Sequence, residues 1–495
     1  MSLTNQIKNQ HLMWRAGFGP AVEQLGDLFK YSPKQIYKAL VKASEKKPEY
    51  INVADDYLQG LYMGIEEAGR QQKKEMSEDE KKIRQQKSRE SIRNLNIYWL
   101  HEMVNSGAQL REKLAFFWHG HFACRNLNIF YQQLLLDVIR RNALGNFGTM
   151  LKEVSKTAAM LNFLNNQQNR KDHPNENFAR EVMELFTLGR GNYTEHDIKE
   201  AARAFTGWTS NPKGEFVFRK FQHDYGSKTV LGQTGNFDGE EVLDILLQQK
   251  QAAKYIAQKI YKFLVNEQVE AGNVDWLADR FYKNNYDISK LLEDIFTSDW
   301  FYQEKNIGVK IKSPIELMAG IRRMLPMTFE RDEALLLLQR ALGQLLFYPP
   351  NVAGWPGGKS WIDSSTLMMR MRIPQMLNDR DEFNVRPKDD DDQMMGSSAP
   401  LRKNDVNEDP KATAMKSLKR LNKPLQVNID WSLYTKNFES IPKEALLANV
   451  SGILLQVKSQ VSQDLIKQYS DNSGRDNFIK TATLQIMSTP EYQLC

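Results

Sequence analysis

The chain has 495 residues, of which 41% are hydrophobic and 26% are charged, a composition typical of a globular protein with ample material for a large core. Its 67 basic and 61 acidic residues leave a net charge of only +6, which does not indicate a nucleic-acid partner, because such partners require a concentrated basic surface. The two cysteines exclude a disulfide framework and suit a reducing compartment.

The sequence carries no evident targeting or membrane segment. The N-terminal stretch MSLTNQIKNQHLMW has no apolar core of signal-peptide length. Nowhere does the chain contain a run of about 18 apolar residues, so no membrane-spanning helix is predicted. We therefore expect a cytoplasmic protein. Export stays an alternative, because a chain from which a signal had been removed would look the same.

Most of the chain is predicted to be helical. A first short helix ends in HLMWRAGFGP, where Gly17 and Gly19 permit a positive φ and Pro20 cannot continue the helix. Residues 70–93 carry dense charge of both signs, which is typical of a solvated helix face or a mobile arm. Beyond them, apolar residues recur at three- and four-residue spacing in four segments that we expect to be helices: SIRNLNIYWLHEMVNS, LREKLAFFWHGHF, FYQQLLLDVIRRNALG and FGTMLKEVSKTAAMLNFLNN.

Residues 214–235 break this pattern. FVFRKF alternates and is aromatic, and SKTVLG is β-branched, so we expect a short β-hairpin or extended flap. Asp238 is then predicted to cap a helix, with Glu241 as its capping-box partner. More helices follow, and the last of this series, RDEALLLLQRALGQLLF, is expected to continue until Pro349 and Pro350 stop it.

Residues 378–412 are rich in Asp, Asn, Pro, Lys and Ser and poor in apolar residues, which predicts a mobile linker or insertion. The chain is thereby divided into three parts: a main helical body over residues 1–377, the linker over residues 378–412, and a C-terminal helical segment over residues 413–495. The main body includes the hairpin flap. The predicted fold class is mainly α: a multi-helical body with a small β-hairpin flap and a helical C-terminal part.

A first prediction follows for this linker. We expect a nonspecific protease to cut within residues 378–412 first and to leave a folded core that ends near residue 375. The composition of the segment cannot offset an ordering entropy of about 1–2 kcal/mol per residue. Limited proteolysis with mass spectrometry of the fragments measures this, and protection of the segment in the free protein would show the prediction to be wrong.

Several segments resemble, in the right order, the motifs of an uncharacterised bacterial family called domain of unknown function 1800. They run from residue 11 to about residue 370 and are HLMWRAGFG, FFWHGHF, NENFAREVMELFTLGRGNYTEHDIKEAARAFTGW, HDYGSKTVLGQTGNFDGEEVLDILL and PPNVAGWPGG. The resemblance implies no defined activity. Family members are often exported and encoded beside proteins similar to sulfatases or phosphatases, which implies a link to envelope or polysaccharide metabolism and a protein partner encoded nearby. Members often carry His where this chain has Phe186, so chemistry that needs this histidine is absent here.

The segment NENFAREVMELFTLG has one polar and one apolar face when its residues are placed at about 100° intervals. Glu181 and Glu184 fall on the polar face together with Arg180. Such a face is commonly solvated and held by ion pairs between residues four apart. Alternatively, it lines a cleft in which the two carboxylates share a metal or act as a raised-pKa acid and a base. If the face lines a cleft, we expect Arg180 to be buried between Glu176 and Glu184. Its replacement by alanine should then lower the free energy of unfolding by roughly 3–5 kcal/mol.

His119 and His121 lie one residue apart in FFWHGHF. On a strand they would point the same way and could clamp a metal, whereas on a helix they lie about 200° apart. The pair therefore binds one metal only if the helix breaks at Gly120. Otherwise we expect one imidazole in a polar cleft beside the glutamate helix and the other held by a backbone carbonyl or a neighbouring side chain.

His223 and Asp224 precede YGSK, a turn signal with Asp first. His223 is either incidental to this turn or, with Lys228, an acid–base group or anion ligand at the mouth of a cleft. The chain has no H-E-x-x-H, paired C-x-x-C, P-loop or G-x-S-x-G motif, so strong signals for zinc, nucleotide phosphate or a serine nucleophile are missing. The cofactor stays open, a divalent metal being one alternative.

Two functions of different classes are consistent with these features. The first is a hydrolase-type enzyme, with or without a metal, whose polar cleft combines the glutamate helix with WHGH and His223. The second is a non-catalytic helical scaffold or an accessory protein for a neighbouring enzyme. Convergence of the predicted side chains in one concave pocket would favour the enzyme, and their dispersal over the surface would favour the scaffold.

Overall fold

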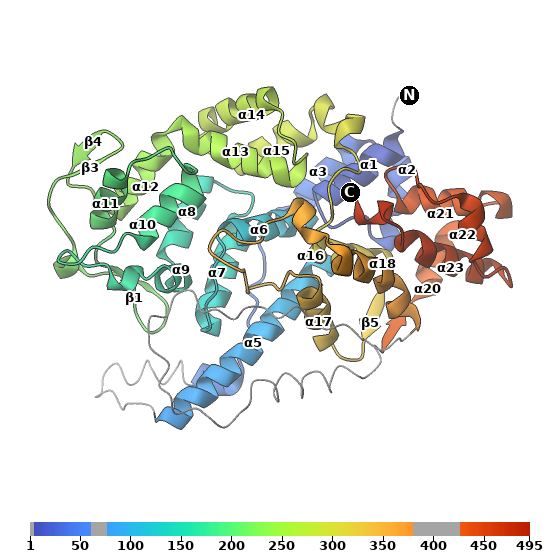
Figure 1. The fold of residues 1–495 in the computed structure, drawn as a ribbon, viewed down its shortest axis with the longest axis horizontal. Helices are drawn as coiled ribbons and strands as arrows, with labels where there is room; N and C mark the ends of the chain where they lie inside the picture. The colour runs from blue at the N-terminus through green and yellow to red at the C-terminus, as the bar shows by residue number, and fades with distance from the viewer. Residues whose placement is uncertain (1–3, 61–76, 380–425) are drawn as a thin grey trace. The chain divides into compact units, whose positions relative to one another are not determined.

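The structure is a computed structural model that describes residues 4–60, 77–379 and 426–495. This part of the chain is mainly helical with three two-stranded antiparallel sheets, so the predicted fold class is confirmed (Figure 1). It forms two compact units. The first comprises residues 1–36, 302–345 and 357–495, and the second comprises residues 37–301 and 346–356. None of the described helices has the length and apolar character needed to cross a membrane.

The second unit carries all the predicted site residues. In chain order, its elements are α3 (Pro33–Ser44), α5 (Glu78–Asn105), α6 (Gln109–His121), α7 (Ile129–Asn142), α8 (Phe147–Lys156), α9 (Ala158–Phe163), α10 (Asn177–Glu181), the π-helix η3 (Val182–Thr187), α11 (Glu195–Ala204), β1 (Trp208–Ser210), β2 (Phe216–Phe218), β3 (Lys228–Val230), β4 (Gln233–Gly235), α12 (Gly239–Gln248), α13 (Lys250–Leu264), α14 (Ala271–Lys283) and α15 (Ile288–Phe296). The first residues of α3 belong to the first unit.

The first unit joins the two ends of the described chain. Its elements are α1 (Asn5–Arg15), α2 (Asp27–Lys30), α16 (Pro314–Met324), β5 (Met327–Phe329), α17 (Glu333–Ala341), α18 (Ser364–Asp379), β6 (Val427–Ile429), α20 (Trp431–Thr435), α21 (Leu446–Leu454), α22 (Gln463–Gln468) and α23 (Arg475–Met487). Figure 1 shows the N-terminal helix α1 near helix α21 of the C-terminal part, where the Gln10 amide donates to the carbonyls of Gly452 and Ile453. Buried Lys312 lies between the rings of Trp14 and Tyr492, 3.8 and 3.9 Å from their centroids.

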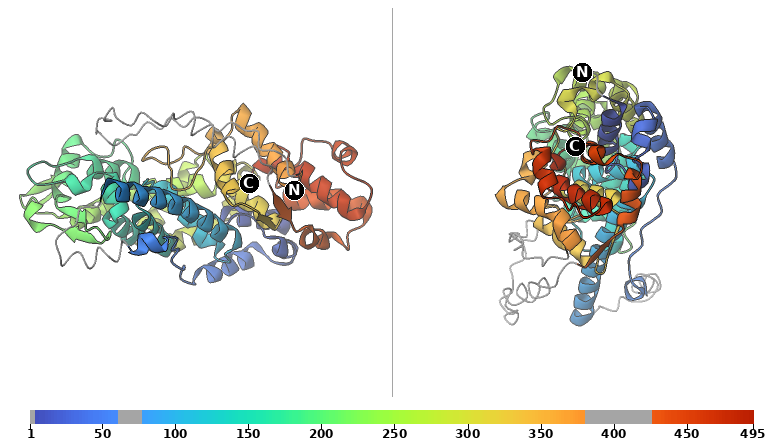
Figure 2. Two further views of the ribbon diagram at one scale, coloured as in Figure 1. Left: turned by 90° about the horizontal axis from the view of Figure 1, so that it is seen from below. Right: turned by 90° about the vertical axis from the view of Figure 1, so that its right-hand side faces the viewer.

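Helix starts follow the capping signals of the sequence. Asp238 accepts hydrogen bonds from the amides of Glu240 and Glu241 and forms the predicted capping box at the start of α12. Ser77 forms an equivalent box at the start of α5, so residues 78–93 of the charged segment are helical, and most of their side chains are exposed. The first turns of α5 project away from the rest of the unit in Figure 1 and in the right-hand view of Figure 2. Residues 70–76 lie outside the described residues.

Two predicted helices differ from the structure. The segment expected to be one helix over FGTMLKEVSKTAAMLNFLNN is two, because the hydroxyl of Thr157 accepts from the amide of Met160 and starts α9. The helix expected to continue to Pro349 ends at Ala341. Gly343 follows with a φ of 84°, the left-handed conformation that commonly ends a helix.

The flap predicted over residues 214–235 is two hairpins rather than one. Strand β1 pairs with β2 and β3 pairs with β4, so the first hairpin begins at Trp208, before the predicted segment. The predicted linker lies outside the described residues from residue 380 onward. Its boundaries, and those of the domains on either side of it, therefore stay predictions.

Candidate functional site

The helix with the predicted carboxylates changes its hydrogen-bond pattern between them. After α10, the segment Val182–Thr187 is a π-helix. The amide of Leu188 donates to the carbonyl of Met183 five residues earlier, at 2.9 Å, and the hydroxyl of Thr187 donates to the carbonyl of Val182 at 2.7 Å. Single π-helical turns are rare and occur frequently at functional sites. Glu181 ends the α-helical part, and Glu184 lies in the π-helical part.

Glu184 is held in its ionised form by two partners. One carboxylate oxygen accepts from the hydroxyl of Tyr193 at 2.5 Å, and the other accepts from the guanidinium of Arg190 at 2.9 Å. The hydrogen bond from Tyr193, and then the charged Arg190, lower the pKa of Glu184 below its usual range. Arg190 is 87% exposed, whereas the Glu184 side chain is only 16% exposed, so the carboxylate lies just beneath the surface.

Glu181 is in the opposite situation. Its carboxylate is half-buried and forms no hydrogen bond or ion pair with any described residue. Burial, and then the negative charge of Glu184, raise the pKa of Glu181, and the positive charge of Arg180 only partly opposes them. The two glutamates therefore have opposite pKa shifts within one turn of the chain.

The cleft interpretation predicted a buried Arg180, and this prediction is wrong. Its side chain is 34% exposed and pairs with Glu195 of α11 at 2.7 Å and with Glu176 at 3.1 Å. The expected partner Glu184 is instead occupied by Arg190 and Tyr193. The side of the helix with Arg180 is thus a surface ion-pair network, while Glu181 is half-buried.

The surface position of Arg180 changes the expected cost of removing it. We expect Arg180→Ala to lower the free energy of unfolding by about 1 kcal/mol or less, because exposed ion pairs contribute little and are screened by salt. Urea denaturation at low and high salt measures the loss, which should shrink further at high salt. A loss of roughly 3 kcal/mol or more would restore the buried interpretation.

His121 is bound to the backbone of the π-helix. Helix α6 continues without a break through Gly120 to His121. The imidazole is buried, and its Nε2 lies 3.2 Å from the carbonyl oxygen of Phe186. Since a carbonyl only accepts, Nε2 carries the proton and Nδ1 is left with a lone pair. Burial, and then the positive charge of Lys259, lower the pKa of His121 well below its ordinary value.

Other side chains satisfy the neighbouring carbonyls at this helix end. The Tyr255 hydroxyl donates to Leu185 at 3.2 Å, and the Gln251 amide donates to Leu188 at 3.1 Å. The last carbonyls of any helix lack partners within the helix. Helix α13, which carries Tyr255 and Gln251, therefore fixes the end of the segment that positions Glu184.

His119 has a different environment on the same helix. It is buried among aromatic rings: Trp355 stacks on it with centroids 5.4 Å apart, and Trp99 and Phe347 meet it edge-on. Burial lowers its pKa to about 3, so the imidazole is neutral. Gly354 brings the Trp355 loop onto α6, where a Cβ at this position would overlap the carbonyl of Gly120. The structure thus places His119 in a hydrophobic contact rather than in a polar cleft.

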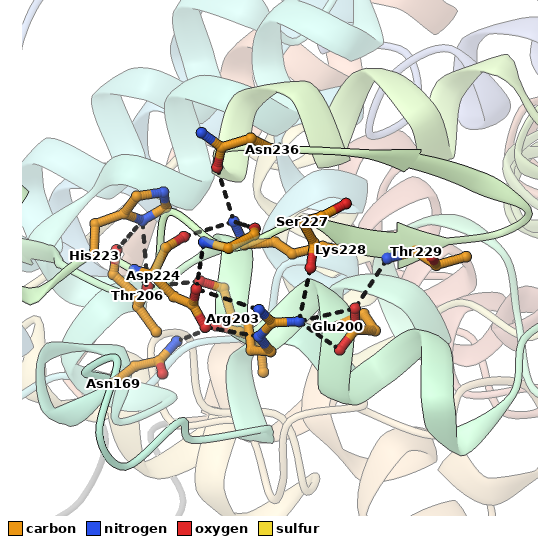
Figure 3. Close-up of polar contacts among 12 residues, drawn as sticks. Asn169, Glu200, Arg203, Thr206, His223, Asp224, Ser227, Lys228, Thr229 and Asn236 are labelled. Atoms are coloured by element: carbon orange, nitrogen blue, oxygen red, sulfur yellow. Dashed lines mark hydrogen bonds and ion pairs between the residues drawn. The ribbon is translucent and has the colours of Figure 1, made fainter.

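His223 belongs to a separate polar cluster (Figure 3). Its Nδ1 donates to the carbonyl oxygen of Thr206 at 2.9 Å, which leaves the lone pair on Nε2, and Figure 3 shows that nitrogen directed away from the cluster. The ring is buried and burial lowers its pKa. Asp224 starts the following turn, because its carboxylate accepts from the amide of Gly226 at 2.7 Å and from Arg203 at 2.7 Å.

Lys228 stabilises this turn from the buried side. Its side chain is fully buried, and its Nζ donates to the carbonyls of Asp224 and Gly226 at 2.6 and 3.0 Å. Such a lysine is a structural cation that holds the loop. It does not stand at the mouth of a cleft with His223, which was one of the two expectations.

A family model described as "Protein of unknown function (DUF1800)" matches residues 11–494, nearly the whole chain. The chain belongs to this family. The resemblance inferred from the motifs is therefore confirmed. Searches of curated proteins and of solved structures find no match.

In this DUF1800 chain the predicted residues do not converge in one place. His121 touches the π-helix that follows Glu181, but His223 lies elsewhere. Glu195, the partner of Arg180, begins α11, and Arg203 of the His223 cluster lies near its end, eight residues or about 12 Å further along. A surface depression of about 660 Å³, lined by residues such as Asn146, Lys152 and Tyr286, contains none of the predicted residues.

The described part of this DUF1800 chain also offers no ready metal site. Among residues 4–60, 77–379 and 426–495, no three or more His, Cys, Asp or Glu side chains gather in a way that could hold a metal ion. His119 and His121 face different partners because the helix does not break between them. The prediction of a metal at this pair therefore gains no support here. The residues that sequence reasoning missed are Tyr193, which holds Glu184, and Lys259, whose positive charge contributes to lowering the pKa of His121.

Proposed function

We propose that this protein is a hydrolase whose acid–base centre is the pair Glu181 and Glu184. The observation that carries the proposal is the contrast between the two carboxylates. Glu181 is half-buried and has no hydrogen-bond or ion-pair partner among the described residues, whereas Glu184 is held by Tyr193 and Arg190. Paired carboxylates whose environments separate their pKa values are a recurrent arrangement for one acid and one ionised group.

In this scheme Glu181 is the acid. It keeps a proton at a pH where an ordinary glutamate is ionised, and it gives this proton to the oxygen of the leaving group. Glu184 stays ionised, orients the attacking water and takes its proton. The elements of water are thereby divided between the two products, and proton exchange with solvent restores both glutamates. Tyr193 and Arg190 are positioning residues that hold the Glu184 carboxylate.

The scheme predicts the pH dependence. The active form has Glu181 protonated and Glu184 ionised. As the pH falls through the lowered pKa of Glu184, kcat/KM should fall, and as the pH rises through the raised pKa of Glu181 it should fall again. Plots of kcat/KM against pH should therefore be bell-shaped. A profile that rises steadily from acid to alkaline pH would contradict the assignment of Glu181 as the acid.

The proposal is tested with a panel of nitrophenyl substrates: a phosphate, a sulfate, a carboxylic ester and glycosides. The glycosides and sulfate are included because the family resemblance implies envelope or polysaccharide metabolism. We expect the full-length protein to turn over one class, and Glu181→Gln to lose that turnover. Glu176→Gln is the matched control, since Glu176 directly precedes the same helix and its carboxylate pairs with Arg180 at the surface. Turnover that persists in Glu181→Gln would exclude the proposed centre.

One observation favours the alternative of a non-catalytic scaffold or accessory protein. The His223 cluster and the glutamate pair lie near opposite ends of α11, and Asp224, Arg203 and Lys228 bind one another rather than facing an open site. A scaffold requires none of these groups to titrate during function. An active wild-type protein with an inactive Glu181→Gln variant would rule this alternative out.

A further inference from the structure

An exposed turn after β2 carries aromatic and basic side chains. The short 3₁₀ turn η4 (Lys220–Gln222) has no buried residue. Phe221 at its centre is 73% exposed, more than any other large hydrophobic side chain in the described part of the chain. Tyr225, four residues further along, is 56% exposed. Single exposed apolar residues are common on protein surfaces, but two aromatic rings this close together indicate an interaction surface.

Backbone hydrogen bonds place a second basic segment beside this turn. The amide of Lys171 donates to the carbonyl of Gln222 at 2.9 Å. Gly207 also joins the two segments, because its amide donates to the carbonyl of Asn169 at 3.1 Å and its carbonyl accepts from the amide of Arg219 at 2.8 Å. Gly207 has a φ of 81°, and a Cβ there would lie 2.7 Å from the carbonyl oxygen of Arg219, so this close approach requires glycine.

The cations of the two segments have no acidic partners. Arg170, Lys171 and Lys220 are exposed, and none of them forms an ion pair with a described residue. Two carboxylates lie in the same segments, but Asp224 is already paired with an arginine, which leaves Asp172 to offset the cations only in part. Positive charge is therefore concentrated here, although the net charge of the whole chain is only +6.

His223 adds a hydrogen-bond acceptor beside these rings. Its imidazole meets the rings of Phe218 and Tyr225 edge-on, with centroids 5.1 and 4.8 Å away. Its Nε2 points away from the polar cluster in Figure 3 and has no hydrogen-bond partner among the described residues. Unlike Nδ1 of His121, this nitrogen is not sealed from solvent. Burial lowers the pKa of His223, so the imidazole is neutral at neutral pH and Nε2 accepts.

We propose that the surface formed by Arg170, Lys171, Lys220, Phe221 and Tyr225 binds single-stranded nucleic acid. The phosphates pair with the three cations, and successive bases stack on the two aromatic rings. An amino group of a base or a sugar hydroxyl donates to the neighbouring imidazole. The overall net charge gave no reason to expect such a ligand, because it does not show where the cations gather.

A single strand fits this surface better than a duplex or a membrane. It carries one negative charge for each nucleotide, and its bases are free to stack on protein rings, whereas the bases of a duplex stack on one another. An anionic membrane would also meet the cations and the rings, but its acyl chains have no donor for the imidazole. The proposal is independent of the glutamate pair and of the reaction assigned to it.

The experiment uses the full-length protein and a fluorescein-labelled oligothymidylate of about 15 nucleotides, with binding followed by fluorescence anisotropy at low salt. We expect saturable binding that Phe221→Ala weakens at least about fivefold, since it removes one stacking platform. Because Phe221 is mostly exposed, this variant should keep the Tm of the wild type. Tyr98→Ala is the control: it removes another ring, 60% exposed, on α5, and should bind as the wild type does.

The salt dependence tests the phosphate contacts separately. Lys220→Gln should reduce the slope of log affinity against log salt concentration by about 0.7, the value for one contact with a single strand. Phe221→Ala should weaken binding without changing this slope. Lys290→Gln, which replaces an exposed lysine of α15 that has no ion pair with a described residue, should change neither the affinity nor the slope.

Four results would overturn the proposal. They are the absence of saturable binding, Phe221→Ala that binds as the wild type does, an unchanged salt slope in Lys220→Gln, and a duplex of the same length that binds as tightly as the single strand. Binding to vesicles of anionic phospholipid without binding to the oligonucleotide would assign the surface to a membrane instead. None of these results bears on turnover by the glutamate pair.

Discussion

Glu112→Ala should lower the free energy of unfolding by roughly 3–5 kcal/mol, because it leaves buried charges without their partner. Glu112 of α6 is fully buried. Its carboxylate accepts from Arg140 at 3.0 Å, from Arg111 at 3.1 Å and from the indole of Trp99 at 3.0 Å. Removal of the carboxylate leaves two buried guanidinium groups without their shared counterion.

A matched control lies on the neighbouring helix. Glu102 also pairs with Arg140, at 3.1 Å, but its side chain is 44% exposed. We expect Glu102→Ala to cost less than about 1 kcal/mol. Urea denaturation followed by tryptophan fluorescence measures both variants, and Trp99 reports directly on the network. If the two substitutions cost the same, the buried carboxylate is not what organises α6.

Glu181→Gln should lower kcat by roughly 100- to 10,000-fold, the range that removal of a positioned acid commonly produces. Glutamine keeps the shape of the side chain but has no proton to transfer. Because the Glu181 carboxylate makes no hydrogen bond or ion pair with described residues, the exchange should leave folding intact. KM should change little, since the lost interaction belongs to the transition state.

Two further variants make this result specific. Glu184→Gln should lose the acid limb of the pH profile together with most of the activity. Glu176→Gln should retain both, because Glu176 contacts only the surface Arg180. A Glu181→Gln enzyme within about threefold of the wild type would remove Glu181 from the reaction.

Features that depend on neighbouring residues in the chain could be predicted well from the sequence. The capping box at Asp238 follows from side chains that reach amides two or three residues away. The break at Thr157 was missed because the apolar spacing continues across it. The early end of α17 was missed because the prolines at 349 and 350 are stronger signals than Gly343.

The candidate site could be predicted only in part. The spacing of Glu181 and Glu184 left open a solvated face, a shared metal, or a raised-pKa acid and a base; burial raises the pKa of Glu181 and the hydrogen bond from Tyr193 lowers that of Glu184, but their roles stay predictions. Arg180 was expected to be buried because the helical pattern shows a polar face but not what covers each part of it. The π-helical turn could not be recognised in the sequence, because it depends on the contacts that α13 and His121 make with its last carbonyls.

The sequence contains one weak indication that Lys259 has an unusual environment. It continues the buried stripe of Ala252 and Ile256 at helical spacing, at a position where an apolar residue is expected. A lysine in such a stripe is commonly one whose stem packs while its ammonium reaches solvent. Only the structure shows that none of the carboxylates of residues 4–60, 77–379 and 426–495 forms an ion pair with it.

Glu181 and Glu184 should have opposite protonation preferences. The most direct measurement is a carboxyl-carbon NMR titration of the protein labelled at glutamate, with Glu181→Gln and Glu184→Gln used to assign the two signals. We predict that Glu181 titrates above the usual glutamate range of about 4.3 and Glu184 below it, and that Tyr193→Phe moves Glu184 back toward that range. Two signals that titrate together at the ordinary value would contradict the account.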